Sequence, residues 1–177
     1  MPSPSASKPP TEPYPPDLGE EEGTADLDDG IQDAVVDGAD WANRRAPRVQ
    51  IRRAELRNTR LTGAELGESA ITDVVFADCR LDLAGLRNAT LERVVFRDCR
   101  MEECDFYAAR LSDVLFERCV LRLATFSAVT LARVELRGCD LNGLRGAEHL
   151  RGARLPLHDA LENATLFATA LGIELVE

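Results

Sequence analysis

The sequence predicts an all-β solenoid, a four-sided coil of short strands followed by a C-terminal α-helix. Between residues 51 and 141 a large apolar residue stands at every fifth position, and a small residue stands two places before each one. Residues twenty apart are often alike. An α-helix has a period of about 3.6 and a flat strand a period of 2, so neither keeps one face buried under a period of five. The chain must therefore turn a corner every five residues.

Two inner columns run through this region without interruption. The large residues are Ile51, Leu56, Leu61, Leu66, Ile71, Phe76, Leu81, Leu86, Leu91, Phe96, Met101, Phe106, Leu111, Phe116, Leu121, Phe126, Leu131, Leu136 and Leu141. The small residues are Val49, Ala54, Thr59, Ala64, Ser69, Val74, Cys79, Ala84, Ala89, Val94, Cys99, Cys104, Ala109, Val114, Cys119, Ala124, Val129, Val134 and Cys139. The other three positions of each five are mostly polar or charged, so the two columns are the predicted core.

A period of twenty is superimposed on the period of five. Val-x-Phe recurs at residues 74–76, 94–96 and 114–116, and cysteine recurs at 79, 99, 119 and 139. If four pentads make one coil, residues twenty apart stack directly on one another, and each coil buries its core against its neighbours. With strands about 4.8 Å apart, the regular coils would form a column on the order of 22 Å tall.

The motif A-x-L-x-x, seen in residues 54–58, 64–68 and 84–88, resembles the pentapeptide-repeat family. The resemblance covers residues 51–141 and implies a right-handed quadrilateral β-helix of pentapeptide repeats. Some members of that family mimic duplex DNA and bind a bacterial type II DNA topoisomerase, either DNA gyrase or topoisomerase IV. Relatives of the gyrase-inhibitor type dimerise through their C-terminal ends, so the resemblance also allows a homodimer.

The flanks of the repeat differ from it in composition. Residues 1–30 are rich in Pro and Ser and then acidic, with almost no large apolar residue, so we expect a disordered arm. Residues 31–50 are expected to form an N-terminal cap or imperfect first coil with Trp41 as its apolar plug, and residues 51–155 the β-helix. No secretory signal and no membrane-spanning run is expected.

Residues 156–177 are expected to form a C-terminal helix and tail. A helical pattern follows Pro156, and Gly172 stands where a helix usually ends. The pattern places Leu157, Leu161, Ala164, Phe167 and Leu171 on one face. This helix is interpreted either as a cap on the last coil or as a dimer contact, and the sequence leaves both open.

Residues with catalytic chemistry are sparse. All five cysteines fall in the small inner column, where a free cysteine behaves as a small packed hydrophobe, and an odd number of thiols favours a reducing cytoplasm. His149 and His158 lie outside the regular coils, and no nucleotide-binding or metalloprotease motif is present. We therefore expect no enzyme, no catalytic residue, no cofactor and no metal site.

The charge is unevenly distributed. The formal net charge is −10, of which residues 1–50 contribute −7, residues 51–140 contribute −1 and residues 141–177 contribute −2. A mimic of duplex DNA needs a strongly negative column. Since the acidity belongs to the arm, topoisomerase binding is implied by the resemblance alone. An acidic chain is also not expected to bind nucleic acid directly.

One outward column departs from the polar rule. Val75, Val95 and Leu115 stand twenty residues apart, and an exposed apolar stripe usually marks a contact. Either the segment around residues 31–36 folds over this stripe, or the stripe is a surface for a partner or for self-association. The sequence thus predicts a non-enzymatic interaction module, with a type II DNA topoisomerase as candidate partner. The alternative is a structural or self-assembly module without that contact.

Overall fold

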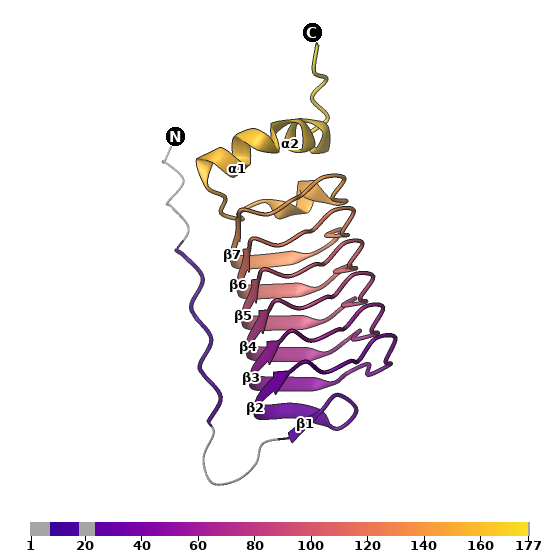
Figure 1. Ribbon diagram of the computed structural model, residues 1–177. Helices are drawn as coiled ribbons and strands as arrows, with labels where there is room; N and C mark the ends of the chain where they lie inside the picture. Colours follow the sequence, from indigo (N-terminus) through magenta and orange to yellow (C-terminus); the bar gives the residue numbers. More distant parts are fainter. Residues whose placement is uncertain (1–7, 18–23, 177) are drawn as a thin grey trace.

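Strands recur along the chain at the twenty-residue interval that the sequence shows. The computed structural model describes residues 8–17 and 24–176 (Figure 1). A short strand, β1 (Thr24–Asp26), is followed by six strands of eight residues each. These are β2 (Gly30–Asp37), β3 (Gln50–Arg57), β4 (Ala70–Ala77), β5 (Thr90–Arg97), β6 (Arg110–Glu117) and β7 (Thr130–Arg137).

The strands β2 to β7 stack in sequence order as one parallel sheet, visible as the ladder of arrows in Figure 1. Paired residues are twenty apart, as with Ile51 and Ile71 or Val75 and Val95. Further parallel bridges, such as the one between Asp105 and Thr125, join the coils on their other sides. The predicted β-solenoid is therefore confirmed, and each coil of twenty residues adds one strand.

Every corner of the regular coils lies two residues after a large inner residue. There the backbone is left-handed, with φ from 44° at Arg53 to 68° at Gly143. This conformation costs an L-residue roughly 1–2 kcal/mol, and glycine, asparagine and aspartate tolerate it best. Even Leu83 and Leu123 adopt it. Since no valine, isoleucine or threonine stands at these corners, the exclusion of β-branched residues is part of the repeat.

The two inner columns form the core as predicted. Each large inner residue from 51 to 141 is at most 1% exposed, except the half-buried Leu131. Phe96 stacks on Phe76 and Phe116, with ring centroids 4.8 and 5.1 Å away. Because like residues repeat every twenty positions, identical rings lie face to face from one coil to the next.

The cysteines pack in the small column and are free thiols in the structure. Cys79, Cys99 and Cys119 are buried, and the thiol of each lies 3.3–3.5 Å from a backbone carbonyl oxygen. Burial raises the pKa of the Cys104 thiol above its ordinary value. A buried thiol with a raised pKa, such as that of Cys104, suits a packing role rather than nucleophilic chemistry.

The N-terminal end of the column differs from expectation. Residues 24–30 are not disordered, because β1 pairs antiparallel with β2 and Leu27 is fully buried. Residues 8–17 also take a defined course along the column (Figure 1). The low apolar content wrongly indicated disorder here. One leucine is enough to hold this segment, because the open end of the column removes its whole side chain from water. The remainder of residues 1–30 lies outside the described residues.

Residues 30–49 form a coil in register with the next one. Its sides are bridged to the second coil at Asp40 and Arg45. Trp41 is half-buried and packs against the core, as expected of a plug. Arg44 reaches outward to Asp28 instead of occupying the interior.

The C-terminal end is covered by several short helices rather than by the single helix that the sequence predicts. A 3-10 helix, η1 (Ala147–Leu150), completes the last coil and precedes α1 (Leu157–Glu162) and α2 (Ala164–Ala170). The break falls at Asn163, whose side-chain amide donates a hydrogen bond to the Asp159 carbonyl oxygen at 2.8 Å. The Asn163 backbone N–H donates to the same oxygen at 3.1 Å, so Asn163 ends α1. Asparagine has a low helix propensity because its side chain bonds to nearby backbone groups, which favours an interruption at this residue.

Candidate interaction surfaces

The outward stripe lies where the twenty-residue spacing predicts. Val75, Val95 and Leu115 are paired in register on β4, β5 and β6. Val75 and Leu115 are half-buried, whereas Val95 is only 6% exposed. The structure contradicts the idea that residues 31–36 fold over this stripe. They belong to β2 and extend the same sheet, where Val35 pairs with Glu55, and Glu55 separates it from Val75 and the stripe.

The segment that runs along this face consists of residues 8–17, which we call the N-terminal arm. Figure 1 shows it running along the whole height of the strand ladder. Backbone N–H groups of Thr11 and Tyr14 donate to the carboxylates of Asp113 and Asp73 at 2.9 and 3.1 Å. Val95, the most buried residue of the stripe, belongs to the coil between these two aspartates, so the arm passes this coil as it runs along the column.

Beside the stripe stands a column of alternating charge, which we call the charge ladder: Asp33, Arg53, Asp73, Arg93, Asp113 and Arg133. Each aspartate receives two hydrogen bonds from the arginine of the next coil. These bonds from Arg133, together with that from the Thr11 N–H, hold the pKa of Asp113 well below its usual range despite burial. The charge ladder was not among the features predicted from the sequence, although its alternation is visible there at twenty-residue spacing.

The expected apolar face of the C-terminal helix is divided between two directions. Phe167 packs against the core, whereas Leu157, Leu161 and Leu171 are 76%, 66% and 71% exposed. Ala164 is also exposed. One part of the helix pair therefore covers the last coil, and another part faces outward.

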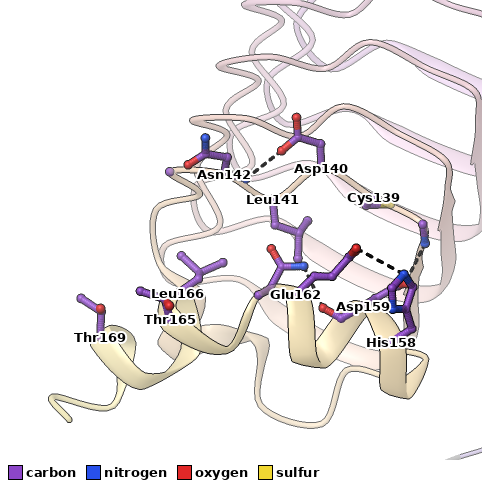
Figure 2. A pocket seen from close by; sticks show the side chains of 13 residues that line it. Cys139, Asp140, Leu141, Asn142, His158, Asp159, Glu162, Thr165, Leu166 and Thr169 are labelled. Carbon is purple, nitrogen blue, oxygen red and sulfur yellow. Dashed lines mark hydrogen bonds and ion pairs between the residues drawn. The ribbon is translucent and has the colours of Figure 1, made fainter. Parts of the chain in front are cut away.

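A cavity of about 730 Å³ lies between the last coil and the helix pair. Figure 2 shows the side chains that line it. Leu141 lines it from the coil, and the Asp159 carboxylate accepts a hydrogen bond from the Gly138 N–H. His158 lies 3.2 Å from Glu162 one turn away, and both side chains are mostly exposed. The Asp159 contact fastens the helix pair to the coil, whereas the contact between His158 and Glu162 lies within α1 and faces solvent.

Arginines neutralise most outward acids of the column. Typical pairs span adjacent coils, as between Arg118 and Asp98 at 2.7 Å or Arg97 and Glu117 at 2.8 Å. Within residues 51–140, all of them described, the acids that lack an arginine within 4 Å are Glu68, Asp78 and Glu103. The column therefore carries no continuous anionic row.

The described residues hold no group of three His, Cys, Asp or Glu side chains placed to bind a metal ion. Among the helices that the structure describes, none is long and apolar enough to cross a membrane.

The parallel coils, filled interior and left-handed corners define the class of this protein, a four-sided β-helix. A family model described as "Pentapeptide repeat region" matches residues 49–126 and 69–145, which together span 97 of the 177 residues. The chain belongs to the pentapeptide-repeat family. The resemblance of its A-x-L-x-x motifs to that family is thereby confirmed.

Several solved structures are similar to the chain at low identity. QnrB1, a plasmid-mediated fluoroquinolone resistance protein, is 16% identical, with a TM-score of 0.43 over 81% of this chain and 92% of that one. HetL from the cyanobacterium Nostoc is 19% identical, with a TM-score of 0.40 over 68% of this chain and 61% of that one. A pentapeptide-repeat protein from the Arabidopsis thaliana thylakoid lumen is 18% identical, with a TM-score of 0.38 over 75% of each chain.

No curated protein matches the chain. Membership of the family rests on the family model rather than on the similar structures.

Proposed function

We propose that this chain is a non-enzymatic protein-interaction module that associates with a second copy of itself through its C-terminal helix pair. The observation that carries the proposal is the exposure of Leu157, Leu161 and Leu171 within one short segment. The tail residues beyond the helices, Ile173, Leu175 and Val176, are exposed as well. Gathered apolar side chains of this kind usually mark an interface, and a two-fold dimer buries the same patch on both subunits.

The packing of the column supports a module that acts through its outside. Large side chains fill one inner column of residues 49–141 and small side chains fill the other, so these coils leave no interior room for a substrate. Binding sites for small molecules are usually concave and enclosed. Recognition is therefore assigned to the outer faces and the ends.

Oligomeric mass tests the proposal. Light scattering should give about twice the 19.4 kDa of one chain, and Leu157→Glu with Leu161→Glu should reduce this to a single chain. Leu83→Glu with Leu123→Glu is the matched control, because these leucines are also exposed but stand at corners of the column. Glu68 and Glu103 already occupy equivalent corners. A single-chain mass for the unaltered protein at micromolar concentration would contradict self-association.

A type II DNA topoisomerase is the second candidate partner, as expected for a partial DNA mimic. The formal net charge of −10 favours it, because a protein that replaces DNA must be negative. The pairing of the column's acids with arginines opposes it, since a phosphate backbone presents uncompensated charge. A supercoiling assay with purified gyrase, with and without a quinolone, tests whether the chain acts on this enzyme. No effect at micromolar protein would exclude this partner.

A further inference from the structure

The N-terminal arm follows the charge ladder with a fixed step. The N–H groups of Thr11, Tyr14 and Asp17 donate to the Oδ1 atoms of Asp113, Asp73 and Asp33, at 2.9, 3.1 and 3.2 Å. The donors are three residues apart, and the acceptors are forty residues apart, which is two coils. The same contact is thus made three times along the column.

The step has the dimensions of a polyproline II helix. Two coils rise about 9.6 Å at a strand spacing of about 4.8 Å. Three residues of polyproline II rise about 9.3 Å and complete one turn, so every third residue returns to the same face. An extended β-strand alternates sides at each residue, and so would turn the middle donor away from the column.

Exposure along the arm has the same period. Pro10, Pro13 and Pro16 are half-buried, and the other residues from 8 to 17 are exposed. Prolines occupy 9, 10, 13, 15 and 16, whereas each of the three donating positions keeps the N–H that proline lacks. The arm sequence therefore combines a preference for polyproline II with an N–H at each position where the ladder accepts.

The ladder holds its acceptors in a fixed orientation. Arg93 donates to both carboxylate oxygens of Asp73, at 2.6 and 2.9 Å, and Arg133 does the same to Asp113, at 2.7 and 2.6 Å. Fork-shaped pairing of this kind fixes a carboxylate geometrically. The Arg93 guanidinium also lies 5.6 Å from the ring centre of Tyr14, within range of a cation–π contact.

We propose that the outer face of the β2–β7 sheet, along the charge ladder, is a docking track for proline-rich segments in the polyproline II conformation. Residues 8–17 occupy it in cis. A proline-rich segment of a partner protein that keeps an N–H at every third residue fits the same acceptors and replaces the arm. The track is separate from the C-terminal helix pair, so it stands whether or not the chain dimerises.

Two proline substitutions in the full chain test the track. Thr11→Pro with Tyr14→Pro removes two donors while keeping the polyproline II preference, so the arm no longer competes from its high tethered concentration. A fluorescein-labelled peptide with the sequence of residues 8–17 should then bind at least tenfold tighter than to the unaltered chain, measured by fluorescence anisotropy. Glu12→Pro is the matched control, because residue 12 donates no hydrogen bond to the ladder, and it should bind like the unaltered chain.

A second peptide, with proline at the positions of Thr11 and Tyr14, should bind none of the three proteins. Equal binding of both peptides, or no saturable binding to the doubly substituted chain, would overturn the proposal. Light scattering on the same samples tests the cis arrangement. If the Thr11→Pro and Tyr14→Pro chain lost a dimer that the Glu12→Pro chain kept, the arm would be docking on a second copy, and the assignment in cis would be wrong.

Discussion

The two open ends of the column are covered in different ways. An open β-helix end exposes apolar core and unpaired backbone groups, which favour aggregation. At the N-terminal end, β1 folds back on β2 and buries Leu27 completely. At the C-terminal end, the helix pair packs Phe167 on the core but leaves Leu157 and Leu161 exposed. The N-terminal end is therefore closed. At the C-terminal end the core of the last coil is covered, but the helices that cover it present exposed leucines of their own.

The largest effect is expected from Leu27→Ala. A fully buried leucine replaced by alanine costs about 2–5 kcal/mol of unfolding free energy, because a cavity adds to the lost burial. Since each coil contacts only its neighbours, the loss should fall first on β2, as faster amide hydrogen exchange there than in β5. Uniform acceleration along the column would contradict a locally closed end.

The next largest effect is expected from Asp159→Ala. It should lower the free energy of unfolding by about 1–3 kcal/mol, because it leaves the Gly138 N–H without its acceptor. Denaturant unfolding and amide exchange in α1 would measure it. Asp159→Asn keeps a side-chain oxygen and should recover part of the loss. If both substitutions had the same effect, the carboxylate would not be fastening the helices through this bond.

Acidification should release the arm from the charge ladder at Asp113. The pKa of Asp113 is lowered by its bonds from Arg133, whereas an unfolded aspartate titrates near 3.9. A lowered folded pKa gives stability that is complete above the unfolded pKa and is lost as the pH falls through the folded one. The amide shift of Thr11 should therefore stay constant from pH 5 to 8 and move only below about pH 4. Movement near pH 6 would indicate another titrating group.

The smallest effect is expected from Leu157→Ala, because this side chain is 76% exposed in the single chain. Surface substitutions usually change stability by less than about 0.5 kcal/mol. Measured at dilution where self-association is absent, the unfolding free energy should be unchanged. A loss comparable to that of Leu27→Ala would show that both ends are closed in the same way.

The period of five was sufficient to predict the coils, the core columns and the place of the cysteines. It could not predict the corners at Leu83 and Leu123, where coil packing overrides the preference of leucine against left-handed backbone. The register also located Val95 correctly. The contacts of the arm with Asp73 and Asp113 join residues 59 and 102 positions apart in the sequence, and no local pattern reports such contacts.

The N-terminal flank shows why composition misled the prediction of disorder. A low apolar fraction describes an arm that cannot build a core of its own. It does not describe an arm that binds to the rigid surface of the column. There three backbone N–H groups donate to the oriented carboxylates of Asp33, Asp73 and Asp113. In the C-terminal flank, the helical period was recognised, but the competing side-chain bond of Asn163 was not.

The alternation of the charge ladder has a consequence for how such a protein can lengthen in evolution. The core repeats every twenty residues, so duplicating one coil leaves the interior unchanged. The ladder repeats every forty, from Asp33 to Asp73 to Asp113. Duplicating a single coil would place like charges in neighbouring coils and shift the later aspartates out of step with the arm. The unit of growth that preserves this surface is a pair of coils.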